Sequence, residues 1–347
     1  MRVKLGDVCE RGSSNLKQSD VVEMKGDYPV YGASGCIGNA DFYHQENSYV
    51  AIVKDGAGIG RTTLHPAKSS VIGTMQYLLP KNNVLPEYLY YVVSYMHLEK
   101  YFTGATIPHI YFKDYKNEEF NLDSVDMQKQ VVEVLGKCEA VIEGRKRELQ
   151  LLDDLIKARF VEMFGDNDKK VAISSLCDVS GGYSFKSEDI SSKGFIKILQ
   201  IGNVYLDDVN WETTNYLPKG FDNVYSRFLL NEGDIVIALT RPIIQSLGNV
   251  KACIVKASDT PCLLNQRVGR IVSKKNVDVN LKFIYGCLMT DDFTRYVESC
   301  CIGCSQPNIS TKDIENYMIP DASYEKQMDF VKFKEQVDKS KVVEKNI

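Results

Sequence analysis

The chain repeats part of itself. Residues 104–117 (GATIPHIYFKDYKN) return as residues 303–316 (GCSQPNISTKDIEN), with six of fourteen aligned positions identical and no gap. A charged, amphipathic segment follows each copy, and residues 3–9 resemble residues 171–177. The period is far longer than the roughly 20–50 residues of a solenoid unit. We therefore expect a duplicated module of globular domain plus helix. A chance match is the alternative, which three matches in the same order disfavour.

Each half of the chain is expected to mix strands and helices. Residues 48–53 and 234–239 are short apolar runs, rich in β-branched residues and flanked by turn formers, which is typical of buried strands. Residues 86–95 and 279–288 have the pattern of helices. The predicted fold class is α+β, with two similar mixed α/β domains. Their long loops are rich in Gly, Asn, Ser and Tyr, and recognition usually lies in such loops.

A long helix is expected between the two halves. Apolar residues recur at alternating steps of four and three, the heptad seam of coiled-coil-like helices that pack lengthwise. At 1.5 Å per residue, a helix over residues 125–165 would extend roughly 60 Å. A surface helix on one domain is the alternative, but the position between two module copies favours a spacer. The expected seam residues are Val131, Leu135, Ile142, Leu149, Leu152, Ile156 and Met163, with Phe330, Phe333 and Val337 in the second helix.

These patterns predict four segments related by a pseudo-twofold repeat. They are a first domain (1–124), a central helix (125–165), a second domain (166–321) and a short C-terminal helix (322–347). The last helix is interpreted as truncated, because it is shorter than its counterpart and has a poorer seam. In an antiparallel pair, we then expect the part of the central helix that carries Leu149 to Met163 to lack a partner.

Charge and hydropathy limit the classes of function. The chain carries 42 Lys and Arg against 46 Asp and Glu, a net charge of −4, whereas free-standing nucleic-acid binders are usually basic. The chain therefore either ignores nucleic acid or binds it through local patches with the help of a partner. No apolar run approaches the roughly 20 residues that span a bilayer, and no secretory stretch begins the chain. We expect a cytoplasmic protein without membrane contact.

The cysteines do not predict a metal site. Seven of the ten are scattered among apolar residues, where a free thiol behaves as a small buried hydrophobe. Cys301 and Cys304 form a CxxC that could begin a zinc site, but zinc needs two more ligands at short spacing. The four histidines all lie in the first third of the chain, and there is no second CxxC. We expect neither a metal nor a cofactor.

Enzymatic chemistry is poorly supported. Residues 56–62 follow a predicted strand, yet they are one residue short of GxxxxGK[ST], with Arg61 in place of Lys, and a strand is expected after them. A tight glycine turn that allows close backbone approach is the preferred interpretation. The chain has no Pro-Pro pair for a methyltransferase motif, and the carboxylates of residues 320–326 have the wrong spacing for a nuclease. We do not expect the chain itself to be an enzyme.

Several stretches resemble the specificity (S) subunit of type I restriction–modification systems, and the likeness covers nearly the whole chain. Residues 27–38 look like the PYGAxGxIG stretch of that family. Residues 181–187, 201–204 and 233–236 look like the start of another type of target-recognition domain. Residues 264–271 are similar to an NQxVxRI strand, and residues 303–310 resemble the exit of the domain. Each motif alone is weak, and their order and duplication make the resemblance.

The resemblance implies two target-recognition domains, each of which binds one half of a split double-stranded DNA site. It implies helices that set the distance between half-sites and dock modification (methyltransferase) subunits. It also implies that restriction (endonuclease and translocase) subunits join the complex and that the chain itself performs no chemistry. A rigid rod suits this task, because half-sites on one DNA face lie near whole turns of about 34 Å apart. The alternative is a solo two-headed DNA-binding or interaction protein without catalytic partners.

Candidate DNA-contacting residues are polar and basic side chains in the matched loops. Arg and Lys recognise guanine, and Asn and Gln recognise adenine, in the major groove. The candidates are Lys54, Arg61, Thr106, His109, Tyr111 and Lys113 in the first half, and Arg241, Gln245, Gln266, Arg267, Gln306, Asn308 and Lys312 in the second. A structural role is the alternative for each: Lys113 and Lys312 would then hold the module's exit, and Gln266 would satisfy buried backbone.

Overall fold

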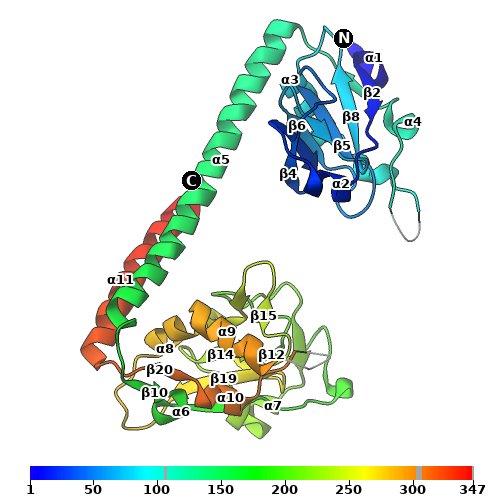
Figure 1. The fold of residues 1–347 in the computed structure, drawn as a ribbon. Helices are drawn as coiled ribbons and strands as arrows, with labels where there is room; N and C mark the ends of the chain where they lie inside the picture. The colour runs from blue at the N-terminus through cyan, green and yellow to red at the C-terminus, as the bar shows by residue number, and fades with distance from the viewer. Residues whose placement is uncertain (105–107, 302–306, 346–347) are drawn as a thin grey trace. The chain divides into compact units, whose positions relative to one another are not determined.

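A computed structural model describes residues 1–104, 108–301 and 307–345 (Figure 1). The chain forms two compact units, Met1–Gly144 and Arg145–Ile347. One helix, α5 (Val125–Phe164), begins in the first unit and ends in the second. Among the described residues, none of the helices combines the length and the apolar character needed to cross a bilayer.

The first unit is built on an antiparallel sheet in the order β2-β8-β5-β6. Strand β5 (Tyr49–Val53) is buried on both faces: Val50 and Ile52 face the core under α3 (Pro86–Tyr95), while its other side chains face a smaller sheet, β4-β3-β7. This double burial explains its unbroken apolar sequence. The other elements are β1 (Arg2–Lys4), α1 (Leu5–Val8), β2 (Cys9–Ser13), α2 (Gln18–Glu23), β3 (Tyr28–Gly32), β4 (Gly35–Ala40), β6 (Thr62–His65), β7 (Ser70–Val71), β8 (Met75–Pro80), the 3-10 turn η1 (Leu98–Tyr101), α4 (Phe112–Tyr115) and β9 (Glu119–Asn121).

The second unit repeats this topology. Its four-stranded sheet has the order β11-β19-β14-β17, and its three-stranded sheet, β13-β12-β18, again combines one antiparallel and one parallel pair. The elements are β10 (Lys170–Ala172), α6 (Ile173–Leu176), β11 (Cys177–Gly181), η2 (Ser187–Asp189), β12 (Ile196–Leu199), β13 (Asn215–Leu217), α7 (Phe221–Val224), η3 (Ser226–Phe228), β14 (Ile235–Ala238), β15 (Ile243–Ile244), β16 (Asn249–Val250), β17 (Ala252–Ile254), η4 (Ala257–Asp259), β18 (Cys262–Leu264), β19 (Val268–Ser273), α8 (Leu281–Leu288), α9 (Asp291–Cys300), α10 (Thr311–Asn316), β20 (Met318–Pro320) and α11 (Tyr324–Lys345). The predicted duplication and the α+β class are thus confirmed.

The predicted helices are found where the sequence carries clear helix-start residues. The helix at residues 86–95 is confirmed, with Pro86 at its first position. The helix expected from residue 279 begins at Leu281, because the side chain of Asn280 caps it by accepting a hydrogen bond from the Lys282 amide. Helix α9 was not predicted. Burial was wrongly expected for Cys36 and Cys138, which are exposed.

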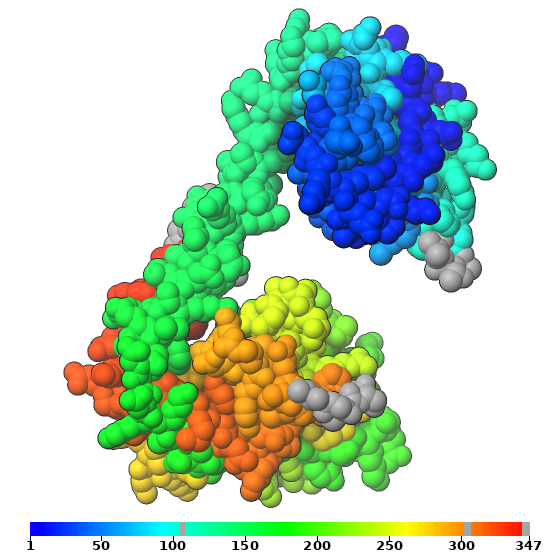
Figure 2. All heavy atoms as spheres, viewed as in Figure 1, coloured from blue at the N-terminus to red at the C-terminus, as the bar shows by residue number. Residues whose placement is uncertain are grey.

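Helix α11 packs antiparallel along the C-terminal half of α5 in the second unit (Figure 1), and Figure 2 shows the two helices in contact side by side. Phe330, near its start, lies 5.9 Å from Phe164 between ring centroids, whereas Lys341, near its end, forms an ion pair of 2.5 Å with Asp153. The expectation that the Leu149–Met163 part of the long helix would lack a partner is therefore wrong. That part is half-buried, whereas Leu135 and Ile142 in the N-terminal half of α5 are exposed.

Candidate nucleic-acid interface

The second unit holds its candidate residues on three segments joined by backbone hydrogen bonds. The chain that leaves β14 donates from Leu239 N–H to the Arg267 carbonyl at 2.9 Å, in the turn before β19. It also donates from Arg241 N–H to the Pro307 carbonyl at 2.8 Å, ahead of α10. These bonds bring Arg241, Arg267 and Asn308 together, all with exposed side chains.

The first unit builds the same arrangement at the end of β5. Lys54 N–H donates to the Thr74 carbonyl at 3.0 Å, and Gly56 N–H donates to the Pro108 carbonyl at 3.0 Å. His109 pairs with Asp55, as Asn308 pairs with Thr240 in the second unit. We call Lys54, Asp55 and His109 the first cluster, and Arg241, Arg267 and Asn308 the second cluster. The two clusters share one backbone arrangement and carry different side chains.

A carboxylate organises the cluster of the first unit. Asp55 lies 2.5 Å from His109 Nδ1 and 3.0 Å from Lys54 Nζ, measured to its two oxygens. The His109 ring stacks toward Tyr111 with centroids 6.3 Å apart, and Lys113 Nζ lies 5.3 Å from the centre of that tyrosine ring. Asp55, Lys54, His109, Tyr111 and Lys113 thus form a set of neighbouring polar and aromatic side chains. Such groups can contact both base edges and phosphates. Asp55 was not among the predicted residues, although the Asp55-Gly56 turn signal marked its position.

The predicted glycine turn is confirmed between β5 and β6. Gly56, Gly58 and Gly60 have φ values of +86°, +89° and +81°, a region that L side chains rarely adopt. A Cβ on Gly60 would also lie 2.5 Å from the Glu99 amide nitrogen. The turn presents Arg61, whose exposed guanidinium donates to the Ala33 carbonyl at 3.0 Å. A hollow of about 400 Å³ adjoins this point, lined by residues 15–18, 32–34 and 72–74 with Ile37.

Arg241 occupies a strained backbone position. Its φ of +48° is left-handed, and its structural counterpart in the first unit is Gly56. A non-glycine residue costs about 1–2 kcal/mol in this region. Such strain is concentrated at functional sites, so the arginine side chain is a strong candidate for a direct role in recognition.

Of the remaining candidates in the second unit, one lies in the same turn as Arg267 and two lie on neighbouring elements. Gln266 is exposed in the same turn as Arg267, and its N–H donates to the carbonyl of Tyr183 at 3.0 Å. Gln245 is exposed after β15, and Lys312 is exposed in the first turn of α10. Thr106 and Gln306 lie outside the described residues. Tyr183, which was not among the predicted residues, belongs to the GGYSFKS motif at residues 181–187 and lies beside this turn. Its ring centroid lies 4.6 Å from that of Tyr225.

Comparison with known proteins identifies the family of this chain. The type I restriction modification DNA specificity domain matches twice, over residues 1–152 and 166–347. The chain belongs to this family. It is 29% identical over 312 residues to the type I restriction enzyme MjaVIII specificity subunit of Methanocaldococcus jannaschii, which covers 84% of this chain and 72% of that protein. The EcoAI specificity subunit of Escherichia coli is 33% identical over 150 residues, covering 43% of this chain and 24% of that protein.

Solved structures share the fold. The S subunit of a type I restriction–modification system from M. genitalium superposes with a TM-score of 0.62 and 14% identity, covering 100% of this chain and 91% of that one. A chain from a study of complex assembly and conformational transition of the type I R-M system gives a TM-score of 0.51 at 14% identity, covering 99% and 91%. The predicted resemblance to specificity subunits is confirmed.

The predicted seam residues of this specificity protein fall into two groups. Those in the C-terminal half of α5 are half-buried, and Ile156 and Met163 pack against the core that contains Phe330. In the N-terminal half, Val131 packs against the core of the first unit, but Leu135 and Ile142 are exposed, as are their neighbours Val134 and Val141. In α11, Phe330 and Val337 are buried, and Phe333 lies under Arg159, 5.6 Å from its guanidinium.

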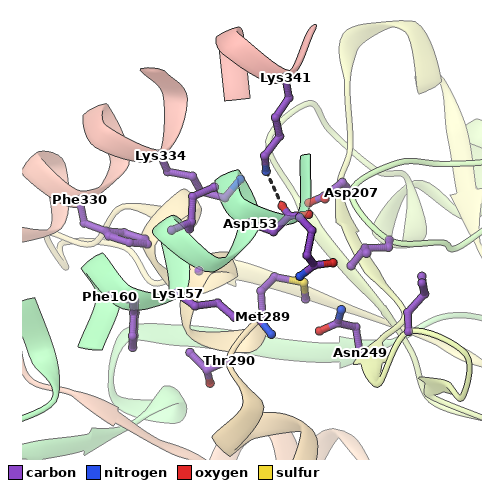
Figure 3. A pocket seen from close by; sticks show the side chains of 15 residues that line it. Asp153, Lys157, Phe160, Asp207, Asn249, Met289, Thr290, Phe330, Lys334 and Lys341 are labelled. Carbon is purple, nitrogen blue, oxygen red and sulfur yellow. Dashed lines mark hydrogen bonds and ion pairs between the residues drawn. The ribbon is translucent and has the colours of Figure 1, made fainter. Parts of the chain in front are cut away.

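A cavity of about 240 Å³ opens in the second unit, where α5 and α11 meet the ends of α8 and the β15–β16 hairpin (Figure 3). Charged groups at its edge pair with one another: Lys341 lies 2.5 Å from Asp153 and 3.1 Å from Asp338, and Lys334 lies 2.6 Å from Asp338. Burial alone would raise the pKa of the Asp338 carboxyl, but the two lysines outweigh it and hold that pKa below its usual value. Within the described part of the chain, no group of three potential metal ligands is present.

Proposed function

We propose that the chain is the specificity subunit of a type I restriction–modification complex and binds a bipartite, asymmetric double-stranded DNA site. One backbone scaffold built twice and carrying different side chains is the observation behind this proposal. The first cluster presents Lys54, Asp55 and His109, and the second presents Arg241, Arg267 and Asn308. Different side chains on equivalent scaffolds favour half-sites of different sequence.

The chemistry of the two clusters favours direct readout. Arginine suits the O6 and N7 acceptors of guanine, asparagine suits adenine, and a carboxylate accepts from the amino group of cytosine. Each well-placed pair contributes roughly 1–3 kcal/mol of discrimination against a wrong base. We assign the other predicted residues of these loops, including Arg61, Gln266 and Lys312, to base or phosphate contacts.

The helices are assigned the role of spacer and docking site. We propose residues 1–124 and 166–321 as the two reading modules, with helical segments at 125–165 and 322–347. Modification subunits would dock on the helices, where Val134, Leu135, Val141 and Ile142 form an exposed apolar face. Restriction subunits would join that complex. Partner subunits would also supply phosphate contacts, which accounts for the net charge of −4.

Methylation mapping tests the proposed function. The methylome of cells with and without the gene should differ by one motif with two unlike halves separated by an unread gap. A continuous or palindromic motif that depends on this chain would contradict the proposal. Co-purification provides a second test: the modification subunit should accompany the chain, and DNA binding without any such partner would favour a solo two-headed protein.

A further inference from the structure

A buried glutamine ties the start of each long helix to its own unit. Gln128 of α5 is fully buried, and its Oε1 accepts a hydrogen bond from Leu85 N–H at 2.9 Å, ahead of α3. Its Nε2 donates to the carbonyls of Asn83 at 2.9 Å and Asp123 at 3.0 Å. One amide therefore joins the helix, the segment before it and the segment before α3.

The second unit repeats this contact. Gln327 of α11 is 3% exposed; its Oε1 accepts from Asn280 N–H at 2.9 Å, and its Nε2 donates to the Ala322 carbonyl at 2.9 Å. The residues directly beside the glutamine differ between the helices: they are Met127 and Lys129 in α5, and Lys326 and Met328 in α11. A buried amide stabilises such a junction only when its hydrogen bonds are made. Two of the three hydrogen bonds of Gln128 recur at equivalent positions around Gln327, which indicates that this amide positions the helix in both units.

A second tether lies further along α5. Tyr91 of α3 donates from its hydroxyl to Glu139 at 2.8 Å. Glu139 is eleven residues beyond Gln128, about 16 Å along the helix axis. Together with Val131, which packs against the core of the first unit, these two polar contacts hold the helix at separate points along its axis. Contacts that are separated along one axis resist tilting of the helix.

We propose that Gln128, with Tyr91 as the second tether, is the positioning residue that sets the direction in which α5 leaves the first unit, and thereby the gap between half-sites. This inference rests on the proposed function. The long helix acts as a lever: a tilt of about 10° at the base of a rod of roughly 60 Å moves its far end by about 10 Å. That displacement corresponds to about three base pairs at 3.4 Å each. Accurate spacing therefore requires a stiff junction.

The junction can be tested without DNA. Spin labels introduced as non-natural amino acids at Lys25 and Glu143 of the full chain would report the distance distribution between the body of the first unit and α5. Gln128→Met keeps the volume and removes the three hydrogen bonds, and Gln130→Met on the exposed face of the same helix is the matched control. We expect a broader distribution for Gln128→Met, a smaller broadening for Tyr91→Phe and none for the control.

The spacing can be tested in the assembled methyltransferase with duplexes whose gaps differ by one base pair. For Gln128→Met, the preference for the native gap over neighbouring gaps should fall by roughly tenfold, while both half-sites remain required. An unchanged preference would overturn the inference, and so would equal loss at every gap, which a residue needed only for folding would cause. If Gln128→Met does not fold, Tyr91→Phe decides: it must weaken the gap preference by severalfold. A wild-type complex without any gap preference would instead refute the proposed function.

Discussion

Removal of one phenyl ring should detach α11 from α5. Phe330 is 1% exposed, and its ring centroid lies 5.3 Å from that of Phe160 and 5.9 Å from that of Phe164, in both cases edge to face. On its other side the ring contacts the backbone of α8 so closely that a Cβ on Gly286 would lie 2.7 Å from it. The ring thus fills a space that no neighbour can readily close.

The expected cost of Phe330→Ala follows from this packing. Burial and the resulting cavity together make Phe→Ala in a core cost about 3–5 kcal/mol. Each aromatic pair contributes about 0.5–1.5 kcal/mol beyond burial, and two such pairs are lost, so the upper part of that range applies. Phe333→Ala is the matched control, because this ring is only half-buried and loses one cation–π contact with Arg159, worth about 1 kcal/mol, so it should cost clearly less than Phe330→Ala.

The assay can observe the second unit alone. Trp211 is the single tryptophan of the chain and lies in that unit, where its Nε1 donates to Asp259 at 2.8 Å. Urea unfolding followed by its fluorescence should show a loss of about 4 kcal/mol for Phe330→Ala, and limited proteolysis should cut α11 first. A loss below about 1 kcal/mol, or an equal loss for Phe333→Ala, would refute the view that this ring anchors the helix pair.

Three further predictions concern recognition, spacing and pH. Arg241→Gly should abolish methylation that depends on the second half-site, while the Trp211 unfolding midpoint stays constant or rises, because glycine relieves the φ of +48°; retained recognition would remove Arg241 from the interface. Insertion of four residues at Gly144, where an added Cβ meets no neighbour, should lengthen the unread gap by one or two base pairs, because four helical residues add about 6 Å. Methylation mapping should then find both half-sites unaltered. The pKa of Asp338 is lowered in the folded state, so its contribution to stability is present above the usual aspartate pKa and is lost as pH falls below about 4. Asp338→Asn should therefore reduce the loss of Trp211-monitored stability between pH 7 and pH 3, and an unchanged loss would contradict the role of its lysine pairs.

The duplication, the fold class and the course of the long helix were determined by the sequence alone. Their signals are local: a heptad seam, the Pro86 start of α3 and the turn formers beside β5 act over a few residues, so they can be recognised without knowing what packs where. The motif at residues 104–117 and its copy also pointed to the loops that carry the two clusters.

The tertiary structure alone decided which groups meet. Asp55 and His109 lie 54 positions apart and touch only because two loops pair at the end of β5. The seam of α5 has one periodicity along its whole length, so the sequence could not tell that α11 would cover Ile156 and leave Ile142 exposed. Gln128 likewise reads as one more polar residue of a charged helix until its three partners surround it. The burial and the hydrogen bonds of a residue depend on distant parts of the chain, so they cannot be predicted from a local sequence pattern.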